Sequence, residues 1–251
     1  MPTVVMVHGA FCGGWAFEHF RGPYEAAGWT VLTPDLPGRG VGRSAAGLSV
    51  SDYAASIVKL CESLSEAPVL LGHSLGGLIC QLAARRVKAR ALVLLAPSAP
   101  WGIHGSTMEE AVTAFGVQLA DPFWMGSVAP DRSLMRSHGL DRVPRAEQAA
   151  ILDRLCPESG RAIREVLNWW LDPFMSTSVG AGVLPMPSLV IAGERDVVHP
   201  VYTVRQTAER IGATYAVMPG MSHWLIGEDG WETVAGATLD WLATQPLPVS
   251  A

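Results

Sequence analysis

One stretch of the chain decides its fold, and it reads Val69-Leu70-Leu71-Gly72-His73-Ser74-Leu75-Gly76-Gly77. The apolar residues before Gly72 predict a buried strand, and the apolar run 78–83 predicts a helix. A serine at such a sharp strand-to-helix turn exposes its hydroxyl, and side chains at Gly72 and Gly76 would clash with neighbouring backbone. The N-terminus of the helix also points at this turn, which favours developing negative charge. Ser74 is therefore the candidate nucleophile.

Strands and helices alternate through the first hundred residues and again near the C-terminus. The expected strands cover residues 4–7, 29–33, 68–71, 91–96, 188–192 and 214–218. The expected helices cover residues 15–28, 51–65, 75–86, 201–211 and 231–242, the second of them capped by Ser51. This alternation predicts an α/β fold, in which a mainly parallel sheet of about six strands carries helices on both faces.

The alternation stops between residues 101 and 185, a stretch called here the insertion. It has helical periodicity and no convincing strand, and helices are expected near 107–119, 145–156 and 159–171. We expect a core of residues 1–100 and 186–251 with a helical cap of residues 101–185. Because open α/β sheets place their sites at the carboxyl edge, the cap should cover that edge.

Aromatic side chains are dense in the insertion, which implies that many of them are buried. Part of this set should form the core of the insertion itself, and the rest should line an apolar pocket over the nucleophile. The residues expected to line that pocket are Phe11, Trp101, Phe123, Trp124 and Trp224. Such a pocket favours a hydrophobic acyl or alcohol group.

A serine hydroxyl at neutral pH needs a base within hydrogen-bond reach and a third group that orients the base. Asp196 and His223 each follow an expected strand, so both should project from the same sheet edge as Ser74. His199 is the alternative base, and Glu194 is the alternative acid. Asp196 and His199 could also form a metal-ligand pair, but no third ligand accompanies them, so no metal is expected.

A tetrahedral intermediate needs two N–H donors for its oxyanion. One donor should be the N–H of Leu75, which directly follows the nucleophile. The other should come from the loop 8–15 after the first strand, where small residues allow close approach to a substrate carbonyl. We favour Ala10 as this second donor, with Phe11 as the alternative.

Composition excludes several classes of protein. The chain has 251 residues, of which 49% are hydrophobic and 16% charged, so it can bury one large core. The net charge is −5 and no basic stripe occurs, which argues against nucleic acid as a partner. No stretch is long enough to span a membrane, and the apolar run at the N-terminus is too short for a secretory signal.

Two further features concern the compartment and cofactors. The four cysteines form no C-x-x-C pair, so we expect reduced thiols in a cytoplasmic protein. The glycine-rich residues 38–44 match neither phosphate-loop spacing, so no nucleotide is expected, and the sequence predicts no cofactor at all. The oligomeric state stays open.

Five motifs together resemble the α/β-hydrolase superfamily over nearly the whole chain. They are His8-Gly9, residues 35–40, residues 72–77, residues 193–196 and Ser222-His223. The start of the chain, residues 8–15, resembles the esterase and hydroxynitrile lyase group that includes plant methyl esterases. In that group the oxyanion donors occupy the positions of Ala10 and Leu75, so the resemblance implies the same two residues.

The resemblance also separates reaction types. The lyases of that group carry a lysine after the catalytic histidine and a threonine at position 9, where this chain has Trp224 and Gly9. Related dehalogenases and epoxide hydrolases use an aspartate where Ser74 stands. The resemblance therefore implies an esterase.

The predicted function is hydrolysis of carboxylic esters of small, largely hydrophobic substrates through an acyl-enzyme on Ser74. A lactonase or a thioesterase would use the same groups, and a non-catalytic ligand receptor on the same fold is the alternative of another class. The expected partner is a small-molecule ester, with no role for a membrane.

Overall fold

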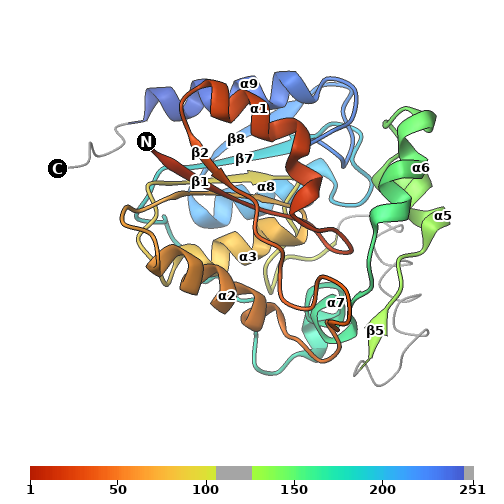
Figure 1. Ribbon diagram of the computed structural model, residues 1–251. Helices are drawn as coiled ribbons and strands as arrows, with labels where there is room; N and C mark the ends of the chain where they lie inside the picture. The colour runs from red at the N-terminus through yellow and green to blue at the C-terminus, as the bar shows by residue number, and fades with distance from the viewer. Residues whose placement is uncertain (106–125, 246–251) are drawn as a thin grey trace.

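The computed structural model describes residues 1–105 and 126–245. Its centre is a six-stranded sheet of order β2-β1-β3-β4-β7-β8 in which every neighbouring pair is parallel (Figure 1). The strands are β1 (Thr3–Val7), β2 (Thr30–Leu32), β3 (Val69–His73), β4 (Ala91–Leu95), β7 (Ser188–Gly193) and β8 (Thr214–Met218). The predicted α/β fold is confirmed, and each strand ends within two residues of its expected bounds.

Helices cover both faces of the sheet. One face carries α1 (Glu18–Ala26) and α9 (Trp231–Thr244), and the other carries α2 (Val50–Glu62), α3 (Leu75–Ala84) and α8 (Val201–Ile211) (Figure 1). A short 3-10 turn, η1 (Gly14–Phe17), precedes α1. Successive strand residues point to opposite faces. Val4 and Met6 accordingly pack under α1 and α9, whereas Val5 and Val7 pack under α2 and α3.

The start of α2 differs from the expectation. Its N-cap is Ser49 and not Ser51, because the side chain of Ser49 accepts from the Asp52 N–H at 3.0 Å. The Asp52 carboxylate in turn accepts from the Ser49 N–H at 2.8 Å, which completes a capping box. The signal that decides the start is therefore the acidic residue three positions after the true cap.

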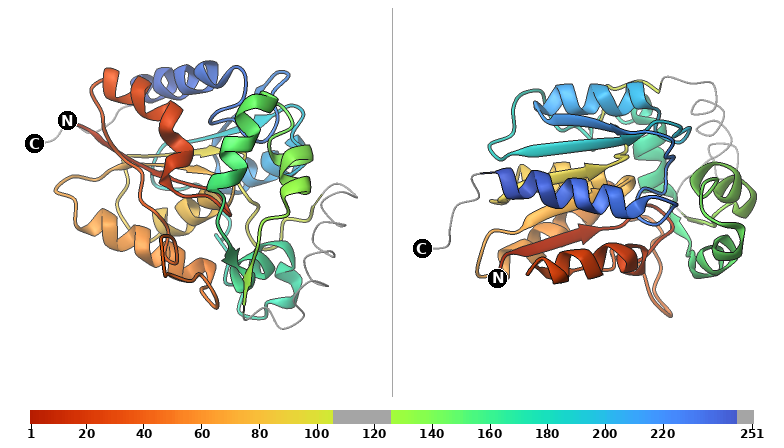
Figure 2. Two further views of the ribbon diagram at one scale, coloured as in Figure 1. Left: turned by 45° about the vertical axis from the view of Figure 1, so that its right-hand side comes forward. Right: turned by 90° about the horizontal axis from the view of Figure 1, so that it is seen from above.

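The described part of the insertion lies at the carboxyl ends of the strands (Figure 2). Its described helical segments are α5 (Arg132–Leu134), the π-helical turn η2 (Met135–Gly139), α6 (Arg145–Arg154), α7 (Gly160–Leu167) and the 3-10 turn η3 (Trp169–Leu171). The helix expected at 145–156 is α6, and the one expected at 159–171 divides into α7 and η3. The helix expected at 107–119 lies outside the described residues.

The expectation that the insertion has no strand is wrong. Two short strands, β5 (Ser127–Val128) and β6 (Glu158–Ser159), pair antiparallel. Each strand has only two residues, which is too short to produce a period-two pattern. Their pairing also joins segments that are far apart in the sequence.

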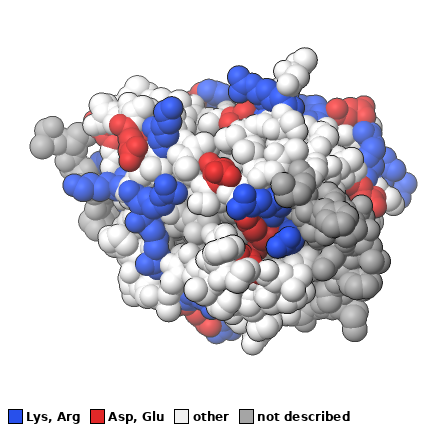
Figure 3. Space-filling view, turned by 90° about the horizontal axis from the view of Figure 1, so that it is seen from below, with Lys and Arg blue, Asp and Glu red and all other residues white. Residues whose placement is uncertain are grey.

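The surface carries charges of both signs. On the face seen from below, Lys and Arg side chains lie among and beside Asp and Glu side chains (Figure 3). No helix in residues 1–105 and 126–245 is long and apolar enough to cross a membrane.

The end of β7 and the loop after β8 approach each other closely at Gly193. A Cβ at this position would lie 2.0 Å from the Ser222 carbonyl oxygen and 2.9 Å from that of Met221. Only glycine allows this contact. The contact brings together the two loops that carry Asp196 and His223.

We predict that Gly193→Ala lowers the free energy of unfolding by about 3 kcal/mol or more, because the added methyl group meets backbone that cannot move aside. The matched control is Gly236→Ala in α9, where an added Cβ meets nothing within 4 Å. This control should raise the free energy of unfolding by about 0.5–1 kcal/mol, since alanine is the better helix former. Urea denaturation followed by circular dichroism measures both, and equal stability of the two variants would contradict this account.

Candidate active site

Ser74 occupies a backbone conformation that residues with side chains rarely adopt. Its φ is 53° and its ψ is −123°, directly before the first residue of α3. Three backbone hydrogen bonds hold it there. The Ser74 N–H donates to Leu95 O at 3.0 Å, and Ser74 O accepts from Gly77 N at 2.9 Å and from Ser98 N at 3.0 Å. The end of β4 and the first turn of α3 thus fix the serine from both sides.

The glycines around Ser74 are required by the packing of backbone against backbone. A Cβ at Gly72 would lie 2.4 Å from the Gly76 carbonyl oxygen. A Cβ at Gly76 would lie 2.0 Å from the Val7 carbonyl oxygen at the end of β1. The glycine spacing seen in the sequence therefore lets α3 press against β1 and β3.

Ser74, His223 and Asp196 form a continuous chain of contacts. His223 Nε2 lies 3.1 Å from Ser74 Oγ, and His223 Nδ1 lies 2.9 Å from Asp196 Oδ2. The three residues are 9%, 6% and 4% exposed, respectively. With the Nδ1–H donating to the carboxylate, Nε2 is free to accept the serine proton. The geometry is that of a nucleophile, a base and an orienting acid.

The Asp196 carboxylate is fixed in its charged form. Its Oδ1 accepts from the backbone N–H groups of Val198 and His199, each at 2.8 Å. Burial acts to raise the pKa of Asp196, but the charge and hydrogen bond of His223 and the N–H of His199 outweigh it and hold that pKa below its ordinary value. Asp196 is therefore ionised at neutral pH and can stabilise a positive imidazole.

The two alternatives for the acid and the base have other partners. His199 Nε2 lies 3.0 Å from Ser98 Oγ, and its ring packs edge-on against His223 at 5.1 Å between centroids. Burial, together with the neighbouring His223, lowers the pKa of His199 to about 4, so it is neutral. Glu194 is exposed and accepts from Gly220 N at 2.7 Å. Among the described residues, no group of three or more His, Cys, Asp and Glu could hold a metal ion.

His73 holds the backbone of the base. Its Nε2–H donates to the His223 carbonyl oxygen at 2.8 Å, and burial, aided by the nearby His223, lowers its pKa to about 3. The ring of Trp224 contacts His73 at 5.5 Å and Trp15 at 6.3 Å between centroids. Trp224 is 4% exposed and belongs to the core under α1 and α9. Its contacts give it a packing role behind the imidazole, which differs from the predicted pocket position.

The loop after β1 is arranged to offer an N–H group beside Ser74. His8 Nε2 accepts from Leu36 N at 3.1 Å, so its proton is on Nδ1 and is donated to Gly9 O at 2.8 Å. Burial lowers the pKa of His8 to about 4, in keeping with a neutral ring. A planar trans peptide directs its N–H away from its C=O, so His8 sets the direction of the Ala10 N–H.

The neighbouring N–H group in this loop is already engaged. Phe11 has φ 63°, and its N–H donates to Glu158 Oε2 at 3.3 Å. Of the two residues considered for the second oxyanion donor, Ala10 is thus the one whose N–H has no hydrogen-bond acceptor within residues 1–105 and 126–245. Leu75 is the first residue of α3, so its N–H has no partner within the helix.

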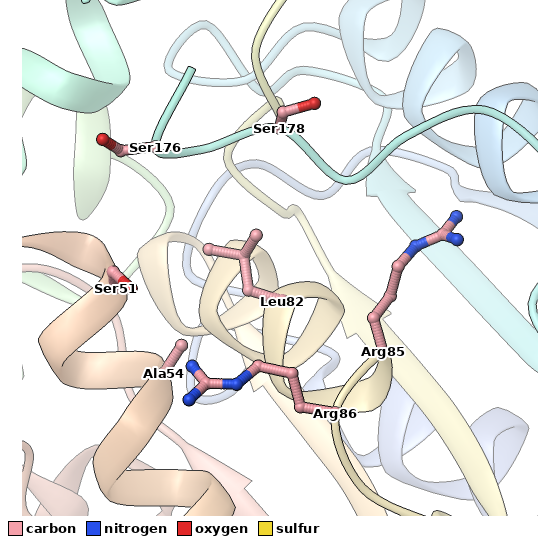
Figure 4. A pocket seen from close by; sticks show the side chains of 7 residues that line it. All are labelled: Ser51, Ala54, Leu82, Arg85, Arg86, Ser176 and Ser178. Atoms are coloured by element: carbon pink, nitrogen blue, oxygen red, sulfur yellow. The ribbon is translucent and has the colours of Figure 1, made fainter. Parts of the chain in front are cut away.

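The predicted pocket residues have different placements. Phe11 and Trp101 are half-buried, and Trp101 packs edge-on against Trp169 at 5.0 Å between ring centroids. Phe123 and Trp124 lie outside the described residues. A cavity of about 240 Å³ between α2, α3 and residues 176–178 lies elsewhere (Figure 4). Its seven lining residues include none of the triad or the loop 8–15.

The family model described as the Alpha/beta hydrolase family matches residues 4–237. The chain belongs to the α/β hydrolase family.

The proteins that resemble this chain are named for different roles. Salicylic acid-binding protein 2 of Nicotiana tabacum is 39% identical over 109 residues, which cover 41% of this chain and 42% of that protein. The magnesium-chelatase 30 kDa subunit of Rhodobacter capsulatus is 28% identical over 256 residues, which cover 96% of this chain and 87% of that protein. The methylesterase MES16 from Arabidopsis has the same fold, with a TM-score of 0.74 at 20% identity over 98% of this chain and 100% of its own. The chain is thus an α/β hydrolase related to esterases.

One buried carboxylate beside the contacts of Ser74, His223 and Asp196 was not found from the sequence. Glu228 is 1% exposed, and its Oε1 accepts from Ser222 N at 2.7 Å, next to His223. Its Oε2 is buried with no hydrogen-bond partner within the described part of the chain. Burial raises the pKa of Glu228 to about 7, and the negative charge of Asp141 acts in the same direction. No local motif marks this residue.

We predict that Glu228 makes the protein less stable as the pH rises from about 5 to about 8. In this window the unfolded chain has already lost the Glu228 proton, while the folded protein must release it inside a buried site. The free energy of unfolding of Glu228→Gln should therefore increase relative to that of the wild type as the pH rises through this window, because the buried histidines contribute equally to both proteins. Calorimetric midpoints at several pH values measure this difference. Glu232→Gln, the loss of an exposed carboxylate in α9, is the control, and equal pH slopes in Glu228→Gln and wild type would show the prediction to be wrong.

Proposed function

We propose that the chain is a serine esterase that cleaves carboxylic esters of small, largely hydrophobic substrates through an acyl-enzyme on Ser74. The observation that carries the proposal is the pair of contacts from Ser74 Oγ to His223 and from His223 to Asp196. One full-length relative is named as a chelatase subunit. Family membership alone therefore does not define the reaction, and the proposal depends on the geometry of the site.

Acylation begins when Ser74 Oγ attacks the ester carbonyl carbon while His223 Nε2 takes the hydroxyl proton. The carbonyl oxygen becomes an oxyanion, which accepts hydrogen bonds from the Ala10 and Leu75 N–H groups. Each such donor contributes about 3 kcal/mol to the stability of the transition state. Asp196 stabilises the imidazolium. The intermediate then collapses, and the leaving alcohol takes the proton from His223.

Deacylation repeats the cycle with water as the nucleophile. His223 removes a proton from water, and the hydroxide attacks the acyl carbon. The same N–H groups hold the second oxyanion. Collapse of this intermediate returns the proton to Ser74 Oγ and releases the carboxylic acid.

The insertion acts in this proposal as a cap of residues 101–185 on a core of residues 1–100 and 186–251. Phe11 and Trp101 would supply apolar surface to the acyl or alcohol group, together with Phe123 and Trp124. A cytoplasmic location likewise stays a prediction. Gly9 and Trp224 stand where the related lyases carry threonine and lysine, which favours an ester over a cyanohydrin.

The leaving group is the open part of the proposal. A lactone or a thioester would meet the same nucleophile and the same oxyanion donors, so a panel of esters, lactones and thioesters is needed to rank them. A non-catalytic receptor would bind ligands without turning over any member of that panel.

A fluorophosphonate should label the wild-type protein with one equivalent on Ser74, because the serine attacks phosphorus with His223 as its base. Labelling should disappear in Ser74→Ala and in His223→Ala. Intact-protein mass spectrometry measures the stoichiometry, and peptide mapping gives the position. Ser74→Ala should keep the wild-type thermal midpoint, and a label on another residue would refute the proposal.

Asp196→Asn should lower kcat on an activated ester about 10³- to 10⁴-fold, because the imidazole loses both its orienting partner and its counter-charge. The matched control is Glu194→Gln, which changes an exposed carboxylate two residues away and should keep kcat within about twofold. Steady-state kinetics on p-nitrophenyl butyrate distinguish the two. Near-normal turnover of Asp196→Asn would remove this residue from the triad.

A further inference from the structure

A buried ion pair joins the insertion to the core of the protein. The guanidinium of Arg39 pairs with the carboxylate of Glu158 in β6, and the two residues are 5% and 0% exposed. Tyr53 of α2 donates its hydroxyl to Glu158 Oε1 at 2.5 Å, and Ser159 N donates to the same oxygen at 2.8 Å. The carboxylate is therefore held by groups from three separate segments of the chain.

The same ion pair holds the loop that carries Ala10. Glu158 Oε2 accepts the Phe11 N–H at 3.3 Å, and Arg39 Nε donates to Cys12 O at 2.8 Å. Between these two contacts, Cys156 N of the insertion donates to Phe11 O at 2.9 Å. Three consecutive peptide groups after Ala10 are thus each fixed by a hydrogen bond, two of them from the insertion.

This arrangement is not explained by stability alone. A buried ion pair adds little net stability over well-packed apolar side chains, because the loss of hydration offsets much of the attraction. The hydrogen bonds of the ion pair do fix the orientation of the peptide groups that they contact. Phe11 needs such support because residues with side chains rarely adopt its φ of 63°. The contacts around Glu158 therefore serve to fix the backbone of the loop after Ala10.

We propose that Glu158 is a positioning residue for the oxyanion hole. By fixing the Phe11 peptide, it keeps the Ala10 N–H directed at the substrate carbonyl, and it makes this direction depend on docking of the insertion. Arg39 and Tyr53 hold the Glu158 carboxylate in place through an ion pair and a hydrogen bond. This inference rests on the proposed function, since it requires an oxyanion at this loop.

The test is Glu158→Gln, which keeps the shape of the side chain and replaces one acceptor oxygen with a donor. A displacement of about 1 Å in an oxyanion donor costs up to about 10²-fold in rate, so kcat on p-nitrophenyl butyrate should fall about 10- to 100-fold. KM should change by less than about threefold, because the donor acts mainly in the transition state.

A trifluoromethyl ketone supplies a readout that a loss of stability would not move. Ser74 Oγ adds to its carbonyl carbon, the proton passes to His223, and the ketone oxygen becomes an oxyanion in the same hole. Its inhibition constant for Glu158→Gln should rise by about the same factor as kcat falls.

The matched control is Glu165→Gln in α7. Glu165 is also a buried carboxylate of the insertion, 6% exposed, and it accepts a core N–H, that of Val50, at 2.8 Å. It pairs with Arg161 and contacts the start of α2, away from the loop 8–15. The thermal midpoint of Glu165→Gln should fall as in Glu158→Gln, but its kcat and its inhibition constant for the ketone should stay within about threefold of wild type.

Tyr53→Phe is the second variant, in case Glu158→Gln does not fold. It removes one hydroxyl that donates to Glu158, and kcat should fall about 3- to 10-fold. A folded Glu158→Gln that matches Glu165→Gln in kcat and inhibition, or an unchanged kcat in Tyr53→Phe, would overturn the inference. Failure of the wild type to react with fluorophosphonate would instead overturn the proposed function, and this inference with it.

Discussion

The positive-φ backbone of Ser74 is the constraint on which the rest of the structure depends. It is possible because α3 presses so closely on the sheet that Gly76 meets the Val7 carbonyl and Gly72 meets the Gly76 carbonyl. Backbone hydrogen bonds to the end of β4 hold the serine in this conformation. Once the hydroxyl is fixed at this edge, the loops after β7 and β8 have only to reach it, and the close contact at Gly193 brings both of them there.

Burial then sets the charge of each group around the serine. Four histidines lie near one another or near the nucleophile, and burial keeps His8, His73 and His199 neutral by lowering their pKa values. A neutral His8 fixes the Gly9 carbonyl, and a neutral His73 holds the His223 carbonyl. Asp196 stays ionised and faces the imidazole. Positive charge that develops during the proposed reaction is therefore favoured on His223, where Asp196 can stabilise it.

Local signals allowed much of this to be predicted. The strands and their parallel direction follow from apolar runs that alternate with helices, and Ser74, Asp196 and His223 each follow such a run. The contacts that were missed are long-range. Nothing in the sequence links Arg39 to Glu158, which are 119 residues apart, or shows that β5 pairs with β6. The sequence likewise does not show that the ring of Trp224 packs in the core cluster under α1 and α9.

The central claim is that one hydroxyl, one imidazole, one carboxylate and two N–H groups converge on a single substrate carbonyl. A crystal structure of the protein with a phosphonate bound covalently to Ser74 tests this claim most directly. The account predicts that the phosphoryl oxygen lies within hydrogen-bond distance of both the Ala10 and Leu75 nitrogens, with His223 Nε2 beside the bound Oγ. A phosphoryl oxygen that faces away from both nitrogens would contradict it.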